Sequence, residues 1–205
     1  THLVLQTAGP SVTGVAYTIR RTLTMAATGV WSTDLYHNAP GPTDYWIGTN
    51  GSDYVMSWDG SATQVTLQSA FGFTCKTLRR WSNMMLYGNL NVSGTRRRTS
   101  IHNSAIGDPF NVTTLEAAEF VAYGGVDEIL TMIPLADYLV RYSSAAIVMT
   151  WLVGGDSLFA FRVAVNDRGP IAPGAVVDHG DRHVFMSTDG AYSFDGLTEI
   201  ITPAV

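Results

Sequence analysis

The chain has 205 residues, a net charge of −5, a hydrophobic content of 46% and only 14% charged residues. This length allows one β-rich domain with a substantial core, and the acidic balance argues against a general nucleic-acid binder. Cys75 is the only cysteine, which excludes an intrachain disulfide and a cysteine zinc cluster. The low charge content fits a protein buried in an assembly, and equally a compact β protein covered by Ser, Thr, Asn and Gly.

The N-terminal stretch does not resemble a signal peptide. The opening THLVLQTAGP has neither the basic start nor the apolar length of a signal peptide. Runs such as AAIVMTWLV stop well short of the roughly 20 residues of a membrane span, so we expect no membrane insertion. The chain lacks an initiating Met and ends just after a strand-like segment, which is compatible with one β-rich domain of a longer or processed protein.

Two similar stretches suggest repeated units. Each has an Asx-Gly turn, an aromatic strand with period-two alternation and then an Asp-Gly turn, because Gly tolerates positive φ and Asx bonds its own backbone. The turns are Asn50-Gly51 and Asp59-Gly60 in the first stretch, and Asp189-Gly190 and Asp195-Gly196 in the second. The interval between the stretches holds about three units of roughly 45 residues, the size of a four-stranded propeller blade.

Strand-like runs fill that interval, many of them rich in β-branched and aromatic residues and most bounded by Gly, Pro, Asn or Asp. They are MMLYGNL, RRTSIHN, DEILTMIPL, DYLVRYS, AAIVMTWLV and SLFAFRVAV. The sequence therefore predicts an all-β, antiparallel, propeller-like arrangement of four-stranded units, around residues 12–67, 73–112, 126–165 and 171–202. A short helix is predicted over residues 113–121, TTLEAAEFV, where Thr114 could cap the first turn.

The basic triplet Arg96-Arg97-Arg98 lies where a hairpin becomes a strand. Alternation sends Arg96 and Arg98 to one face and Arg97 to the other, so a continuous phosphate-binding stripe is not expected. We favour inter-subunit contacts or surface ion pairs for these residues over contact with nucleic acid.

Catalytic and metal-binding patterns are weak. DHGDRH, residues 178–183, could bring imidazoles and carboxylates to a metal, but a turn around Gly180 between two strands explains it better. Glu116 and Glu119 would share one face of the predicted helix, and a solvated face is favoured over an acid/base pair. Asp127-Glu128 is typical of a loop. We expect no catalytic residue, metal or cofactor.

STDGAYSF is similar to the Asp box of sialidase-like propellers, S-x-D-x-G-x-T-W, but here Gly190 directly follows Asp189. Asp boxes are structural turns. A carbohydrate-binding or glycosidase-like propeller for receptor recognition, with Trp and Tyr as sugar platforms, remains the alternative function.

Residues 84–200 resemble a β-rich tail protein family of tailed bacteriophages. The resemblance rests on short motifs: Gly88-Asn89, Arg98, Ser104 with Ile106-Gly107-Asp108-Pro109, Pro134-Leu135, Asp137 to Leu139, Arg168-Gly169, Pro173, and Val184 to Gly196. Asn103 and Val112 stand where the family pattern has an aromatic residue and a tryptophan. The family includes nozzle, adaptor and stabilisation proteins that form rings, often sixfold, below the portal.

This resemblance implies a structural protein of the virion, assembled in the host cytoplasm. The expected partners are further copies of the chain in a homo-oligomeric ring, such as a hexamer, and other tail or portal-proximal proteins. DNA would pass through the channel without specific binding, since an acidic ring repels it. A fragment of a larger scaffold without separate activity is a third hypothesis.

Overall fold

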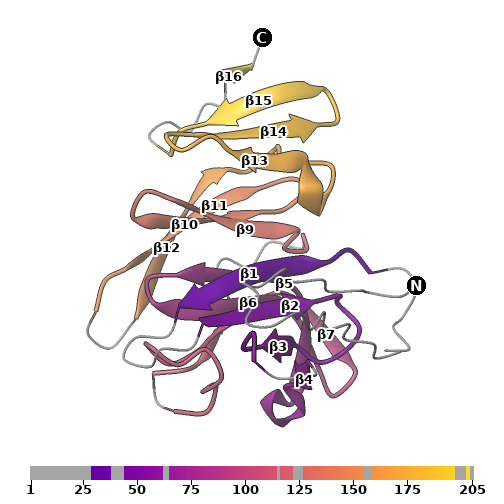
Figure 1. Ribbon diagram of the computed structural model, residues 1–205. Coiled ribbons are helices and arrows are strands. Elements are labelled where there is room, and N and C mark those ends of the chain that lie inside the picture. Colours follow the sequence, from indigo (N-terminus) through magenta and orange to yellow (C-terminus); the bar gives the residue numbers. More distant parts are fainter. Residues whose placement is uncertain are drawn as a thin grey trace, which may run out of the picture.

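The computed structural model describes residues 29–37, 44–61, 65–114, 116–121, 127–154, 158–196 and 202–203. Four antiparallel sheets of four strands each follow one another along the chain (Figure 1). Within the described residues, helical structure is limited to two short 3-10 turns, η1 (Ser69–Phe71) and η2 (Pro173–Ala175). The predicted all-β class with four-stranded antiparallel units is confirmed.

In each sheet the strands that are neighbours in space are also consecutive in sequence. The first sheet contains β1 (Ser32–His37), β2 (Asp44–Thr49), β3 (Met56–Trp58) and β4 (Thr66–Leu67). The second contains β5 (Phe73–Trp81), β6 (Met84–Val92), β7 (Thr95–Asn103) and β8 (Glu119–Val121). The third contains β9 (Thr131–Leu135), β10 (Tyr138–Tyr142), β11 (Ile147–Leu152) and β12 (Phe159–Val165). The fourth contains β13 (Val176–Asp178), β14 (His183–Ser187), β15 (Gly190–Phe194) and β16 (Thr202–Pro203).

The helix predicted over residues 113–121 is wrong. Its last three residues form β8, in which Phe120 pairs with Ile101 and Glu119 with His102 of β7. A helix of nine residues is marginal by itself, whereas a strand at a sheet edge gains ladder hydrogen bonds and a packing surface for Phe120. Phe120 stacks on Phe159, with ring centroids 4.5 Å apart. The second sheet therefore extends beyond residue 112, where the predicted unit ends; residues 12–28 of the first predicted unit lie outside the described residues.

The apolar core forms three layers between successive sheets. Tyr36 and Ile47 of the first sheet pack with Leu78 and Tyr87 of the second. Trp81, Leu86 and Ile101 of the second sheet meet Met132 and Leu139 of the third. Between the third and fourth sheets lie Val140, Tyr142 and Met149 on one side and Phe185, Tyr192 and Phe194 on the other. Figure 1 shows the third sheet between the second and the fourth, so each layer joins two neighbouring sheets.

No helix in the described part of the chain is both long and apolar enough to cross a membrane. Apolar side chains of the described strands are buried between the sheets. In β9, for example, Met132 faces the second sheet and Ile133 faces the fourth, so both faces of the third sheet are covered. A strand buried on both faces loses the simple alternation of polar and apolar residues.

Candidate functional site

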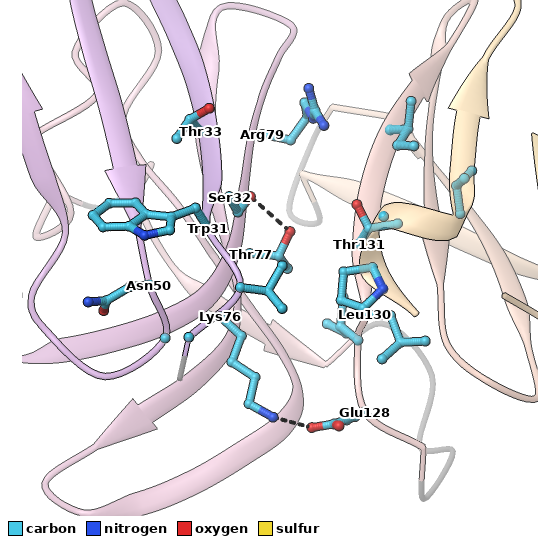
Figure 2. A pocket seen from close by; sticks show the side chains of 18 of the residues that line it. Trp31, Ser32, Thr33, Asn50, Lys76, Thr77, Arg79, Glu128, Leu130 and Thr131 are labelled. Carbon is cyan, nitrogen blue, oxygen red and sulfur yellow. Dashed lines mark hydrogen bonds and ion pairs between the residues drawn. The ribbon is translucent and has the colours of Figure 1, made fainter. Parts of the chain in front are cut away.

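The structure contains a cavity of about 610 Å³ to which the first strand of each sheet contributes. Ser32 and Thr33 of β1, Lys76 and Thr77 of β5 and Thr131 of β9 line it, together with Pro173 of η2 and Val176 of β13. Figure 2 shows side chains from the first three sheets facing the same space. A pocket of this size suits a small molecule. We take this cavity as the candidate site and call it the central cavity.

One end of the central cavity carries Lys76, Arg96 and Glu128. The ammonium group of Lys76 donates to Glu128 Oε2 at 2.8 Å (Figure 2). Arg96 donates through Nη1 to the carbonyl oxygen of Asn89 at 3.0 Å and through Nη2 to that of Gly51 at 3.4 Å. The hydrogen bonds from Lys76 and Asn89 lower the pKa of Glu128, so this carboxyl is ionised at neutral pH.

Asn89 lies in a β-bulge, and its side chain makes hydrogen bonds that connect residues at this end of the cavity. The pairing of β6 with β7 shifts register between Gly88 and Leu90, and Asn89 takes a φ of 57° there, a conformation that Asn tolerates. Its amide Nδ2 donates to Glu128 Oε2 at 3.1 Å and to the carbonyl oxygen of Ile129 at 3.0 Å. The bulge therefore aims a buried polar side chain from the second sheet at the segment that leads into the third.

The wall of the cavity between its ends is rich in hydroxyl groups. Ser32 Oγ lies 3.4 Å from Thr77 Oγ1 and accepts the backbone N–H of Leu78 at 3.0 Å, which joins the first sheet to the second. Thr131 faces this pair from β9 (Figure 2). Arg79 lies further along the wall, where its Nε donates to the carbonyl oxygen of Met132 at 3.0 Å and its Nη1 lies 3.7 Å from Asp34 Oδ2.

The three arginines of the basic triplet have different surroundings. Arg96 lines the central cavity and bonds two carbonyl oxygens of its own chain. Arg97 is exposed and forms an ion pair with Glu119 of β8. Arg98 is also exposed, and its charge contributes to the lowered pKa of Glu128. Arg96 thus lies at the cavity, Arg98 acts on Glu128, and Arg97 acts at the edge of the second sheet.

The predicted turn residues lie in loops at the ends of the sheets and make local backbone contacts. Asn50 Oδ1 accepts the N–H groups of Ser52 and Asp53, Asp59 Oδ1 accepts that of Ser61, and Asp108 Oδ1 accepts that of Phe110. These are Asx turns, which satisfy backbone donors outside the sheets. The glycines that follow or precede these side chains have φ values between 78° and 80°: Gly51, Gly60 and Gly107. The carbonyl oxygen of Pro109 accepts the buried hydroxyl of Tyr87.

The last two turns contact neighbouring parts of the fold. Asp189 Oδ2 lies 3.1 Å from Arg168 Nη2 and accepts the hydroxyl of Tyr192 at 3.0 Å. Gly190 starts β15 opposite Ser187. Asp195 follows β15, and a Cβ atom on Gly196 would come within 3.2 Å of Leu135 in the third sheet. These turns therefore attach the fourth sheet to the rest of the chain as well as reversing its direction.

The DHGDRH segment forms a hairpin turn between β13 and β14. Gly180 has a φ of 93° and donates its N–H to Asp178 Oδ1 at 2.7 Å. His183, however, is fully buried, with Nε2 3.0 Å from the carbonyl oxygen of Pro134 and Nδ1 2.8 Å from the hydroxyl of Tyr142. A carbonyl can only accept, so Nε2 carries the proton and Nδ1 accepts from Tyr142. Burial lowers the pKa of His183, which favours this neutral form.

Among the described residues, no group of three or more His, Cys, Asp or Glu side chains is arranged so that it could hold a metal ion. The two predicted carboxylates are separated. Glu119 in β8 forms an ion pair with Arg97 of β7, and the backbone oxygen of Glu116 accepts a hydrogen bond from the side-chain amide of Asn103. Burial raises the pKa of the Cys75 thiol to about 12, so it is a protonated core residue. The described lining of the central cavity offers hydrogen-bonding groups and charged side chains.

Sequence reasoning did not assign Lys76, Arg79 or Thr131 to a site, and it placed Glu128 in a loop. Lys76 and Arg79 belong to β5, whereas Thr131 belongs to β9 and Glu128 to the segment before it, so no local spacing links the two pairs. Arg141 was also missed: it is 2% exposed in β10, and its Nε and Nη1 have no hydrogen-bond partner. Several residues that the sequence singled out do line the cavity: Asn50, Gly51, Arg96 and Pro173. Gly88-Asn89 lies beside it, where the bulge occurs.

Comparisons with known proteins add little to this geometry. No family model and no curated protein matches the chain. Among solved structures, it is similar to a candidate 6-phosphogluconolactonase from Bacteroides uniformis, with 11% identity and a TM-score of 0.49 over 84% of this chain and 54% of that one. It is also similar to the computationally designed protein Ika8, with 12% identity and a TM-score of 0.37 over 82% of this chain and 60% of that one. The chain spans little more than half the length of these proteins, and such a distant likeness assigns no activity.

Proposed function

We propose that the chain is a structural protein of a tailed bacteriophage virion, a nozzle or adaptor-type ring component that assembles below the portal and encloses the DNA channel. We further propose that its four sheets are arranged as the blades of a propeller-like protomer. The observation that carries this proposal is the convergence of strands β1, β5, β9 and β13, the first of each sheet, on one central cavity. Radial repetition of four-stranded sheets around a centre is the propeller plan.

The motifs that carry the resemblance to tail proteins support a mechanical role, because they join neighbouring sheets. Gly88 leaves room for Met132 of the third sheet, since a Cβ atom there would lie 3.0 Å from the methionine methyl group. Asn89 bonds the segment before β9, and Arg168 and Asp189 meet beside the fourth sheet. A protomer whose sheets are tied in this way keeps its shape when its neighbours exert force on it.

The outer face of the fourth sheet suits a contact between copies of the chain. Val177 is 62% exposed and Met186 is 48% exposed, and the pairing of β13 with β14 places both on the face opposite the core. In the described part of the chain, the equivalent faces of the second and third sheets are covered by the next sheet. A neighbouring copy that packs on the outer face of the fourth sheet would cover it as each earlier sheet is covered by the next. A ring with head-to-tail contacts requires such a contact between copies.

In this proposal, DNA passes through a channel enclosed by the ring of protomers, and not through any single protomer. The central cavity lies inside one protomer and is far too small for a duplex. The net charge of −5 disfavours adhesion of DNA to the ring wall, because DNA binding depends on cations that neutralise phosphates. Arg97 and Arg98 are exposed and remain candidates for contacts with neighbouring subunits.

Native mass spectrometry and electron microscopy of the purified protein test this function. We expect closed cyclic particles, and we expect the double variant Val177→Glu/Met186→Glu to be monomeric and folded, since both side chains are exposed. Ile106→Glu is the matched control, because Ile106 is 54% exposed in the turn after β7 and does not belong to the fourth sheet. This variant should still form rings. A wild-type protein that stays monomeric at high micromolar concentration would count against the proposal.

The alternative, a carbohydrate-binding or glycosidase-like propeller, has one feature in its favour. Trp31 lines the central cavity, and tryptophan rings are common stacking surfaces for ligands. A glycan array and a glycosidase screen separate the two functions. The structural ring predicts no signal in either assay, whereas specific glycan retention that is lost in Trp31→Ala would favour the alternative.

A further inference from the structure

The central cavity has an excess of positive charge in an acidic protein. Its described lining includes the cations Lys76, Arg79 and Arg96 and one carboxylate, that of Glu128. Glu128 is engaged by Lys76 and by Asn89, both through Oε2. Arg79 has Asp34 as its nearest described carboxylate, 3.7 Å away and outside the lining. The chain as a whole carries −5, so this local balance is opposite to the overall charge.

Arg96 is the cation with the least compensation. Its guanidinium group donates to two carbonyl oxygens, those of Asn89 and Gly51, and no carboxylate of the described residues forms an ion pair with it. A guanidinium group has five N–H donors in a planar fork that matches an oxyanion. The two carbonyl contacts fix its orientation at the cavity wall. These two contacts leave other N–H donors of the guanidinium group without a partner in them.

The rest of the cavity fits the body of a small polar molecule. Ser32, Thr77 and Thr131 place hydroxyl groups along the wall (Figure 2), and Trp31 is also part of the lining. The volume of about 610 Å³ lies within the usual range for small-molecule pockets. A concave site with a net positive charge concentrates anions, because its low-dielectric walls focus the field.

We infer that the central cavity binds a small molecule that carries an oxyanion, either a phosphate or a carboxylate group. Arg96 and Lys76 hold the oxyanion, and the hydroxyl groups of Ser32, Thr77 and Thr131 hold the polar body of the molecule. Glu128 limits the affinity, because it competes with the ligand for Lys76. This inference is independent of the role of the chain in a ring.

Calorimetric titration of the full chain at low ionic strength tests this site, with inorganic phosphate and citrate as probes and neutral glycerol as the blank. Phosphate and citrate distinguish the two kinds of oxyanion. We expect saturable binding of at least one of them and none of glycerol. Arg96→Gln should weaken this binding by about tenfold or more, as loss of a charge-assisted hydrogen bond does. Glu128→Gln should tighten it severalfold.

Arg97→Gln is the matched control, because it removes the same charge from the adjacent residue, whose side chain pairs with Glu119 outside the cavity lining. Its affinity should equal that of the wild type. Lys76→Met serves as a second test in case Arg96→Gln fails to fold, since Lys76 is partly exposed. The absence of saturable binding to either anion would overturn the inference, and so would an equal loss of affinity in Arg96→Gln and Arg97→Gln.

Discussion

Arg168 lies over the ring of Tyr192, with its guanidinium carbon 4.6 Å from the ring centroid. Both residues also contact Asp189 Oδ2, Arg168 at 3.1 Å and Tyr192 at 3.0 Å. Two motifs that are separate in the sequence, Arg168-Gly169 and the stretch around Asp189-Gly190, are therefore halves of one cluster. This cluster attaches the segment after β12 to the hairpin of β14 and β15.

Replacement of Arg168 by Met should lower the free energy of unfolding by about 1 kcal/mol, because a cation–π contact and a partly exposed ion pair are both lost. Urea denaturation measures the change. Asp189→Asn keeps the hydrogen bond from Tyr192 and should cost less than Arg168→Met. If the double variant Arg168→Met/Asp189→Asn were no less stable than the wild type, the cluster would not stabilise the fold.

Gly169→Ala should be severely destabilising, by about 3 kcal/mol, because the added Cβ atom would overlap the backbone carbonyl oxygen of Ser143. A backbone atom at a turn between strands cannot move aside as a flexible side chain can. Gly174→Ala is the matched control, since a Cβ atom there meets open space, and it should change the stability by less than about 0.5 kcal/mol. Thermal unfolding compares the two variants, and equal midpoints would contradict this account of Gly169.

Arg141→Met should leave the stability unchanged or raise it by about 1 kcal/mol. Arg141 is buried with two unpartnered nitrogens, and burial lowers its pKa to about 10, so it still carries its charge at neutral pH. An apolar side chain of similar length removes that unsatisfied charge. Arg162→Met, on an exposed position of the same sheet, should have little effect. A loss of more than about 2 kcal/mol in Arg141→Met would show that this arginine is satisfied in the native protein.

Stability should fall as the pH is lowered below about 6.5, the ordinary pKa of histidine. Burial lowers the pKa of His183 and of His102 in the folded chain, so the unfolded chain binds protons first and unfolding becomes easier in acid. Each of these residues contributes up to about 1.4 kcal/mol per pH unit between the two pKa values. The loss is absent above the ordinary pKa.

Denaturation of the His183→Gln variant at pH 7 and pH 5 tests this pH dependence. The variant should lose less stability on acidification than the wild type, because its side chain at position 183 does not titrate. His179→Gln is the control, since His179 is about three-quarters exposed in the same hairpin and should leave the dependence unchanged. An identical loss in His183→Gln and the wild type would rule out His183 as a source of acid sensitivity.

The local sequence pattern was sufficient to predict the strands and turns of much of the fold. Alternation around Tyr192 and Phe194 and the Asx-Gly turns predicted strands and their ends, because both depend on residues close in sequence. The short helix at 113–121 failed because pairing of Phe120 with Ile101 is a tertiary contact that propensity does not contain. His183 looked like part of a polar turn, yet the sheet packing buries it against Tyr142.

The central cavity could not be predicted from the sequence, because it too depends on tertiary contacts. Lys76, Arg96 and Glu128 meet only because strands of different sheets converge. Arg96 and Arg97 lie opposite Asn91 and Leu90 in the regular part of the pairing between β6 and β7, so alternation places their side chains on opposite faces, as predicted. Alternation does not tell which of the two faces lies beside a cavity. Only the spatial arrangement of the sheets distinguishes a cavity residue from its exposed neighbour.

The most direct measurement of the central proposal is cryo-electron microscopy of intact tailed phage particles whose genome encodes this chain, with the chain marked by a fused tag. We predict density for several copies in a closed ring below the portal, each copy with four sheets around its own centre and the DNA channel enclosed between copies. Particles with complete tails that lack the tagged chain would contradict the proposal.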